Sequence, residues 1–158
     1  MIQYAEEFSL ATCVCLNITD NCNLACKYCF VHQKPHFMTL QTAKDSVDFV
    51  VKNLLTKEEL GLLEKPDETA TITFFGGEPT LLWDEIIVPT VLYAEEKYAN
   101  LIQFNMTTNG TLLDQKRIDF LQKHNIPILL SIDGNKKIQD VNRPCKNGLS
   151  SFDMVAPN

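Results

Sequence analysis

Residues 22–29 read Cys22-Asn23-Leu24-Ala25-Cys26-Lys27-Tyr28-Cys29, in which three cysteines form a C-x3-C-x2-C arrangement. This spacing lets one loop fold back on itself and aim three thiolates at one point. A structural zinc ion normally takes four protein ligands, and a [4Fe–4S] cluster held by cysteine thiolates also normally takes four. Because only three cysteines are local, one coordination position is left for a substrate or a cofactor. The motif therefore indicates a reactive metal site as well as a structural one.

Other interpretations of the same cysteines stay open at this point. His32, Cys13 or Cys15 could complete a zinc site, and the cysteines could also pair as disulfides. Six cysteines in 158 residues is a lower density than disulfide-stapled small domains have, and no secretory signal is expected before them. Cys13 and Cys15 alternate with Val14 on a predicted strand, so we expect both on one face as small buried side chains.

Three further motifs follow along the chain: Gly76-Gly77-Glu78-Pro79, Thr107-Thr108-Asn109-Gly110 and Ser131-Ile132-Asp133-Gly134. Together with the cysteine motif, in which Tyr28 directly precedes the last cysteine, they resemble the ordered motifs of radical S-adenosylmethionine (SAM) enzymes. Each motif lies at the end of a predicted strand. Four ordered matches are a much more specific signal than the cysteine motif alone.

The resemblance implies a reductive mechanism. In this family the three thiolates hold three irons of a [4Fe–4S] cluster, and the fourth iron binds the amino and carboxylate groups of SAM. An electron from the cluster cleaves SAM to methionine and a 5′-deoxyadenosyl radical, which takes a hydrogen atom from an unactivated carbon. The cofactors carry this chemistry, and the protein binds them, orients the substrate and shields the radical from water.

The composition is that of a globular protein, with 45% hydrophobic and 22% charged residues. Its apolar runs are far shorter than a membrane-spanning helix of about 20 residues, so no membrane partner is expected. The net charge of −6 argues against a nucleic-acid partner, which usually needs a basic stripe. The first residues are acidic and lack a basic signal-peptide region, so we expect a cytoplasmic location.

Strands are predicted over residues 12–18, 70–75, 102–107 and 127–132, and they alternate with helices over about 40–54, 82–98 and 113–124. This order predicts an α/β fold with a parallel sheet and a ligand site at the carboxyl ends of the strands. Thr39 is expected to cap the first helix, and residues 57–69 to form a connection.

The resemblance implies a partial (β/α)6 radical SAM barrel, of which residues 1–158 would be the N-terminal portion with about four βα units. Full barrels of about 250 residues are longer. We therefore expect the strand over residues 127–132 to lack a neighbour on one side, which makes self-association through this open edge a further expectation.

The resemblance also assigns roles to particular residues. It implies cluster ligands and SAM-binding groups, namely Cys22, Cys26 and Cys29 for iron and Tyr28, Gly77, Glu78, Ser131 and Arg143 for SAM. Tyr28 would contact the adenine side, Gly77 would offer its backbone to the ammonium group, and Glu78 would add charge or hold the loop. Ser131 would donate a hydrogen bond, and Arg143 would pair with the carboxylate in two-point geometry. Asn109 and Asp133 are expected to shape loops, and no catalytic acid or base is assigned.

One departure from the family pattern is Gln139-Asp140, which stands where many relatives have a His-Asp pair before the arginine. The segment from Ser131 to Asp153 resembles enzymes with a C-terminal SPASM extension, such as sulfatase-maturing enzymes and maturases of ribosomal peptides. A peptide or protein substrate and a reducing electron donor such as flavodoxin or ferredoxin are therefore expected. A zinc-stapled binding module and a non-catalytic electron-transfer protein remain as alternatives.

Overall fold

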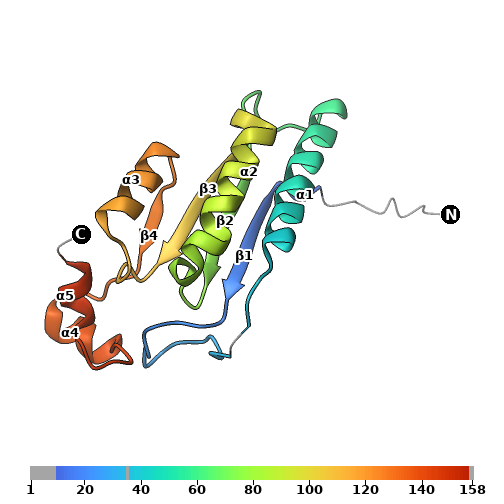
Figure 1. Ribbon diagram of the computed structural model, residues 1–158. Coiled ribbons are helices and arrows are strands. Elements are labelled where there is room, and N and C mark those ends of the chain that lie inside the picture. The colour runs from blue at the N-terminus through green and yellow to red at the C-terminus, as the bar shows by residue number, and fades with distance from the viewer. Residues whose placement is uncertain (1–9, 35, 157–158) are drawn as a thin grey trace.

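Four parallel strands form a single sheet in a computed structural model that describes residues 10–34 and 36–156. The strands follow the order of the sequence across the sheet: β1 (Cys13–Thr19), β2 (Ala70–Gly76), β3 (Ile102–Thr108) and β4 (Ile128–Leu130). Helices α1 (Leu40–Glu59), α2 (Val88–Tyr98) and α3 (Gln115–Lys123) connect them and lie along one side of the sheet (Figure 1). The predicted α/β fold with about four βα units is confirmed.

The hydrophobic core lies between the sheet and these helices. Phe74 and Phe104 stack with ring centroids 5.3 Å apart, and Ile72 and Met106 beside them are buried. Side chains alternate between the two faces of a strand, so the residues between these face the opposite side of the sheet. On β1 that opposite side carries the exposed cysteines, Cys13 and Cys15.

The prediction for these two cysteines was therefore wrong in one respect. They share a face, as expected, but they are exposed rather than buried because no described helix covers that face of the sheet. Their strand register pairs Cys13 with Thr71 and Cys15 with Thr73, so they border a row of small polar side chains.

Local sequence signals explain where the first long helix begins. Thr39 accepts a hydrogen bond from the Thr42 amide at 3.1 Å, which confirms the predicted cap. The core side of α1 is lined at helical spacing by Ala43, Val47, Val50, Val51 and Leu54. The helix continues to Glu59, farther into residues 57–69 than predicted. No described helix is both long enough and apolar enough to cross a membrane.

The last two helices were not predicted. α4 (Lys136–Asn142) and α5 (Ser151–Val155) are short and lack an extended apolar repeat. A side-chain cap begins each helix. The Asn135 side chain accepts a hydrogen bond from the Ile138 amide, and the Ser150 hydroxyl accepts one from the Asp153 amide. Before α2 the chain forms a 3₁₀ turn over Pro79–Leu82 and a π-helical turn over Trp83–Ile87.

Candidate functional site

The four sequence motifs meet at one end of the sheet. Each follows a parallel strand, and the carboxyl ends of parallel strands share one edge. A cavity of about 250 Å³ lies there, and all eight residues predicted to bind metal or SAM line it. The structure thus brings together Cys22, Cys26, Cys29, Tyr28, Gly77, Glu78, Ser131 and Arg143. Asn109 and the ring of Phe75 also border it.

A short antiparallel contact holds the cysteine loop, defined here as residues 20–29. The Ala25 amide donates to the Pro144 carbonyl at 2.8 Å, and the Lys27 amide donates to the Asn142 carbonyl at 2.9 Å. Leu24 and Cys145 form the β-bridge between the two segments. This contact places Arg143 beside the cysteine loop, although the two are more than 100 residues apart in sequence.

Cys145 is a residue that the sequence analysis did not single out. It is buried and packs in one cluster with Cys22 and Leu24, with Cys26 and Met154 at the border. Burial raises the pKa of the Cys145 thiol. No motif contains this cysteine, so only its place in the antiparallel contact shows that it neighbours the cysteine loop.

The three motif cysteines differ in their surroundings. Cys22 is buried, and its sulfur accepts hydrogen bonds from the Leu24 amide at 3.4 Å and from Asn109 Nδ2 at 3.7 Å. Burial raises the pKa of Cys22 and Cys26, and Arg143 opposes this rise at Cys26. Metal binding needs the thiolate form, so these thiols would release protons when they bind iron.

The chemistry of the donor set, three cysteine thiols that line one cavity, is compatible with an iron–sulfur cluster. Among the described residues, no three side chains of His, Cys, Asp or Glu converge closely enough to hold one metal ion. The expectation that the loop aims three thiolates at one point is therefore not met. His32, which could have completed a zinc site, is exposed and does not line the cavity. Thiolates spread around a cavity suit a cluster in which each ligand binds a different iron.

Gly76 and Gly77 have a packing role. A Cβ atom on Gly77 would lie 2.2 Å from the Asn21 carbonyl oxygen, and one on Gly76 would lie 2.4 Å from the Thr19 carbonyl oxygen. The Gly77 amide already donates to the Thr19 carbonyl at 2.6 Å. Because these glycines have no side chain, the backbone at residues 76–77 can lie against the backbone at the start of the cysteine loop. The space that their side chains would need is thus taken by protein backbone and is not reserved for a ligand alone.

Glu78 joins two of the motif loops. Its side chain is fully buried and accepts hydrogen bonds from the Thr80 amide and hydroxyl, from the Thr108 hydroxyl and from the Asn109 amide, at 2.6–3.1 Å. These four donors satisfy both carboxyl oxygens. The geometry favours the loop-holding alternative over a direct charge contact for this residue.

Tyr28 and Arg143, which both line the cavity, are joined to each other through Asp133. The Tyr28 hydroxyl donates to Asp133 Oδ2 at 2.5 Å, and Arg143 Nε donates to Asp133 Oδ1 at 3.0 Å. Partial burial and the hydrogen bond to Asp133 raise the pKa of Tyr28 to about 12. The hydrogen bond from Tyr28, together with Arg143, lowers the pKa of Asp133.

Gln139 and Asp140 hold the backbone near this network in place. Gln139 is fully buried, and its Oε1 accepts from the Asp133 amide at 2.7 Å. Asp140 accepts from the Ser150 hydroxyl at 2.8 Å and from the Phe152 amide at 3.0 Å, and so fixes the start of α5. Both residues therefore position backbone, and neither lines the cavity.

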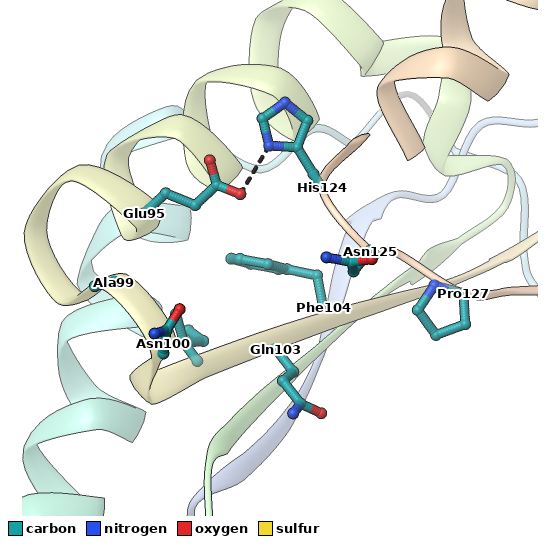
Figure 2. Close-up of a pocket in the computed structure, with 9 residues that line it drawn as sticks. Glu95, Ala99, Asn100, Gln103, Phe104, His124, Asn125 and Pro127 are labelled. Carbon is teal, nitrogen blue, oxygen red and sulfur yellow. Dashed lines mark hydrogen bonds and ion pairs between the residues drawn. The ribbon is translucent and has the colours of Figure 1, made fainter. Parts of the chain in front are cut away.

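A larger cavity of about 690 Å³ lies at the opposite, amino-terminal end of β3 (Figure 2). Its wall contains the pair of Glu95 and His124, whose Oε1 and Nδ1 atoms are 2.7 Å apart. Gln103 and Phe104 of β3 border it as well. None of the four motifs contributes a residue to this cavity, so it is not the site that the sequence predicted.

Comparisons with known proteins identify the family of this chain and similar proteins. The sequence profile of the Radical SAM superfamily matches residues 16–156. An uncharacterised protein of Methanocaldococcus jannaschii is 36% identical over 86% of this chain and 43% of its own length. A cysteine-type anaerobic sulfatase-maturating enzyme of Clostridium perfringens is 32% identical over 87% of this chain and 36% of its own length. The radical SAM cyclopropyl synthase TigE of Paramaledivibacter caminithermalis is 27% identical over 90% and 32%.

Solved structures of radical SAM relatives have a similar fold. Native anSMEcpe with bound AdoMet and Kp18Cys peptide aligns with a TM-score of 0.76 and 30% identity, over 92% of this chain and 38% of that chain. Native anSMEcpe with bound AdoMet aligns with a TM-score of 0.73 and 28% identity, over 92% and 39%. The sheet is thus the partial barrel of these structures, which confirms the predicted fold class. The chain spans less than half the length of each relative named here.

Proposed function

The chain belongs to the radical SAM superfamily, and from this premise we propose that it cleaves S-adenosylmethionine reductively at a [4Fe–4S] cluster and modifies a peptide or protein. The observation that carries the proposal is the cavity at the carboxyl end of the sheet. There the three thiols of the C-x3-C-x2-C motif and an arginine lie around one space of about 250 Å³.

Cys22, Cys26 and Cys29 would hold the cluster. Two N–H groups already donate to the sulfur of Cys22, and such hydrogen bonds tune the reduction potential of a bound cluster. When bound, the cluster and SAM supply the electron and the 5′-deoxyadenosyl radical of this family's reaction. The protein's part is to orient SAM and to keep water away from it.

Four residues would orient SAM in this proposal. The Arg143 guanidinium suits the carboxylate, because a planar fork of donors matches two carboxylate oxygens. Gly77 would accept from the ammonium group through its carbonyl, since its amide is already used. Ser131 and the half-exposed Tyr28 line the same cavity.

The substrate part of the proposal rests on the relatives. Two of them are named for sulfatase maturation and cyclopropyl synthesis, and a similar solved structure holds a peptide together with AdoMet. A peptide or protein substrate is therefore proposed for the protein to which this chain belongs. A reducing donor of the flavodoxin or ferredoxin kind would supply the electron. All six cysteines are free, which suits a reducing, cytoplasmic location.

Anaerobic reconstitution with iron and sulfide tests this function directly. We expect a brown protein with about four irons per chain, as a cubane cluster requires. With SAM and a strong reductant it should form 5′-deoxyadenosine. Replacement of Cys22, Cys26 or Cys29 by Ala should abolish cluster binding, because each removes one of only three local ligands.

Cys13→Ala and Cys15→Ala are matched controls, since both thiols are exposed on the sheet and do not line the cavity. They should bind iron as the wild type does. Stoichiometric zinc without iron uptake would favour a zinc-stapled module instead. A stable cluster that never cleaves SAM would favour an electron-transfer protein.

A further inference from the structure

Asp133 joins three segments of the chain, two of which contribute residues that line the cavity. One carboxylate oxygen accepts from the Tyr28 hydroxyl in the cysteine loop, and the other accepts from Arg143 Nε in the segment after α4. Its own amide donates to the buried side chain of Gln139. Both the carboxylate and the backbone of this residue are therefore held in place.

The way in which Asp133 contacts Arg143 leaves part of the guanidinium available. A guanidinium has five N–H donors in a rigid, planar fork. Asp133 uses only the Nε donor, at 3.0 Å, and in residues 10–34 and 36–156 no protein group accepts from the two terminal nitrogens. The Arg143 side chain is only 17% exposed and lines the cavity, and its Cζ lies 5.3 Å from the centre of the Tyr28 ring.

We propose that Asp133 is a positioning residue, which fixes Arg143 through Nε so that the two terminal nitrogens receive the carboxylate of SAM. The inference rests on the proposed function, because it concerns the same cavity. Through Tyr28, which lies between Cys26 and Cys29, the same carboxylate also ties the arginine to the cysteine loop. Asp133 acts through Arg143 and does not itself contact the ligand.

The contact geometry distinguishes this role from two others. A carboxylate that paired with the terminal nitrogens would compete with the ligand for them, and Asp133 does not occupy them. A carboxylate that bound SAM directly would line the cavity, whereas Asp133 is not among the residues that line it. A positioning residue predicts that loss of Asp133 weakens SAM binding and that this weakening depends on Arg143. A competitor predicts tighter binding when Asp133 is removed, and a direct ligand predicts a loss that does not depend on Arg143.

A double-mutant cycle on the cluster-loaded protein tests this dependence, with SAM affinity as the readout. Arg143→Ala should weaken binding about 10- to 100-fold, as expected for loss of a hydrogen bond to a charged group. Asp133→Ala should weaken it by about tenfold, and Asp133→Asn by less, because one acceptor remains. Asp133→Ala should add nothing in the Arg143→Ala background, since positioning has no effect without the positioned group.

Iron content and the melting temperature of each variant separate misfolding from loss of positioning. Asp153→Asn is the matched control, because Asp153 is an exposed carboxylate that pairs with Lys136 away from the cavity. It should leave SAM affinity unchanged. Tyr28→Phe keeps the ring over the guanidinium and removes only the hydroxyl donor, so it should cause a smaller loss than Asp133→Ala.

A second readout needs neither the cluster nor SAM. In the iron-free protein, the Nε–H nuclear magnetic resonance signal of Arg143 should be protected from solvent exchange, and Asp133→Ala should remove this protection. An unchanged signal, tighter SAM binding in Asp133→Ala, or fully additive losses in the double mutant would each overturn the inference. If the wild type binds no SAM at all, the proposed function fails, and the Arg143 signal still decides whether Asp133 positions the arginine.

Discussion

At Gly77 a single hydrogen in place of a side chain lets two loops touch. The space that a Cβ atom would need is occupied by the Asn21 carbonyl, 2.2 Å away, and that atom belongs to backbone and cannot rotate out of the way. Overpacking of this kind costs about 1–3 kcal/mol, and more when backbone must move. Asn21 directly precedes Cys22, so any shift reaches the first of the three cysteines that we propose as cluster ligands.

We therefore predict that Gly77→Ala lowers the free energy of unfolding by about 2–3 kcal/mol and reduces iron uptake. Urea unfolding of the iron-free protein and iron analysis after reconstitution measure the two effects. Gly61→Ala is the control: Gly61 has a φ of +67° but nothing within 4 Å of its added Cβ. Its cost should be only the strain of the left-handed conformation, about 1–2 kcal/mol, with normal iron uptake.

At the scale of elements, Asp48 connects α1 to α2. Its Oδ1 accepts from the Tyr93 hydroxyl at 2.7 Å and from the Tyr98 hydroxyl at 2.9 Å, and Lys97 Nζ lies 2.9 Å from Oδ2. Partial burial alone would raise the pKa of Asp48, but the hydrogen bonds from Lys97 and the two tyrosines outweigh this and lower it. A lowered pKa means that the folded state stabilises the charged carboxylate of Asp48 more than the unfolded state does.

Asp48→Asn should reduce stability at pH 7 by about 1 kcal/mol, a value kept small because the side chain is 39% exposed. The contribution of Asp48 is present above its ordinary pKa of 3.8 and is lost as the pH falls below that value, through the lowered pKa of the folded state. The difference between the two proteins in urea unfolding should therefore shrink below pH 3.8.

Asp45→Asn, on the same helix, is the control for this measurement. Asp45 is exposed, and within the described residues its side chain accepts only from Gln41 on its own helix, so its substitution should change stability by less than about 0.5 kcal/mol. A pH-independent difference for Asp48→Asn would mean that the charge on Asp48 contributes nothing to the contact between α1 and α2.

At the scale of the whole molecule, β4 is the exposed edge of the described sheet. It pairs only with β3, and its three residues, Ile128, Leu129 and Leu130, are exposed by 38–69%. An apolar edge strand with unpaired backbone groups can pair with another chain. The structure describes a strand of three residues, shorter than the predicted 127–132, although the Ser131 amide still donates to the Thr108 carbonyl at 2.9 Å.

We predict that the 158-residue chain self-associates through β4 and that Leu129→Lys shifts it toward monomer, because a lysine on an edge strand opposes pairing. Sedimentation velocity at micromolar concentration measures this. Leu60→Lys, at a leucine just after α1 that is 62% exposed against 69% for Leu129, should not alter the association. A compact monomer in the unmodified chain would show that the β4 edge does not pair.

The sequence by itself determined the order of the four strands and of the three helices that connect them, the end of the sheet at which the motifs gather, and the family. The reason is local: alternation of apolar residues, a cap such as Thr39 and glycine-containing turns act within a few residues, and parallel strands bring their carboxyl ends to one edge. The eight predicted site residues therefore line one cavity.

Only the tertiary structure decided how these residues contact one another. The pairing of residues 142–146 with the cysteine loop, the approach of Gly77 to Asn21 and the contact of Asp133 with Tyr28 all join segments that are distant in sequence. The exposure of Cys13 and Cys15 likewise depends on which face of the sheet the helices cover. No local pattern encodes such contacts, because they depend on the path of the whole backbone between the two segments.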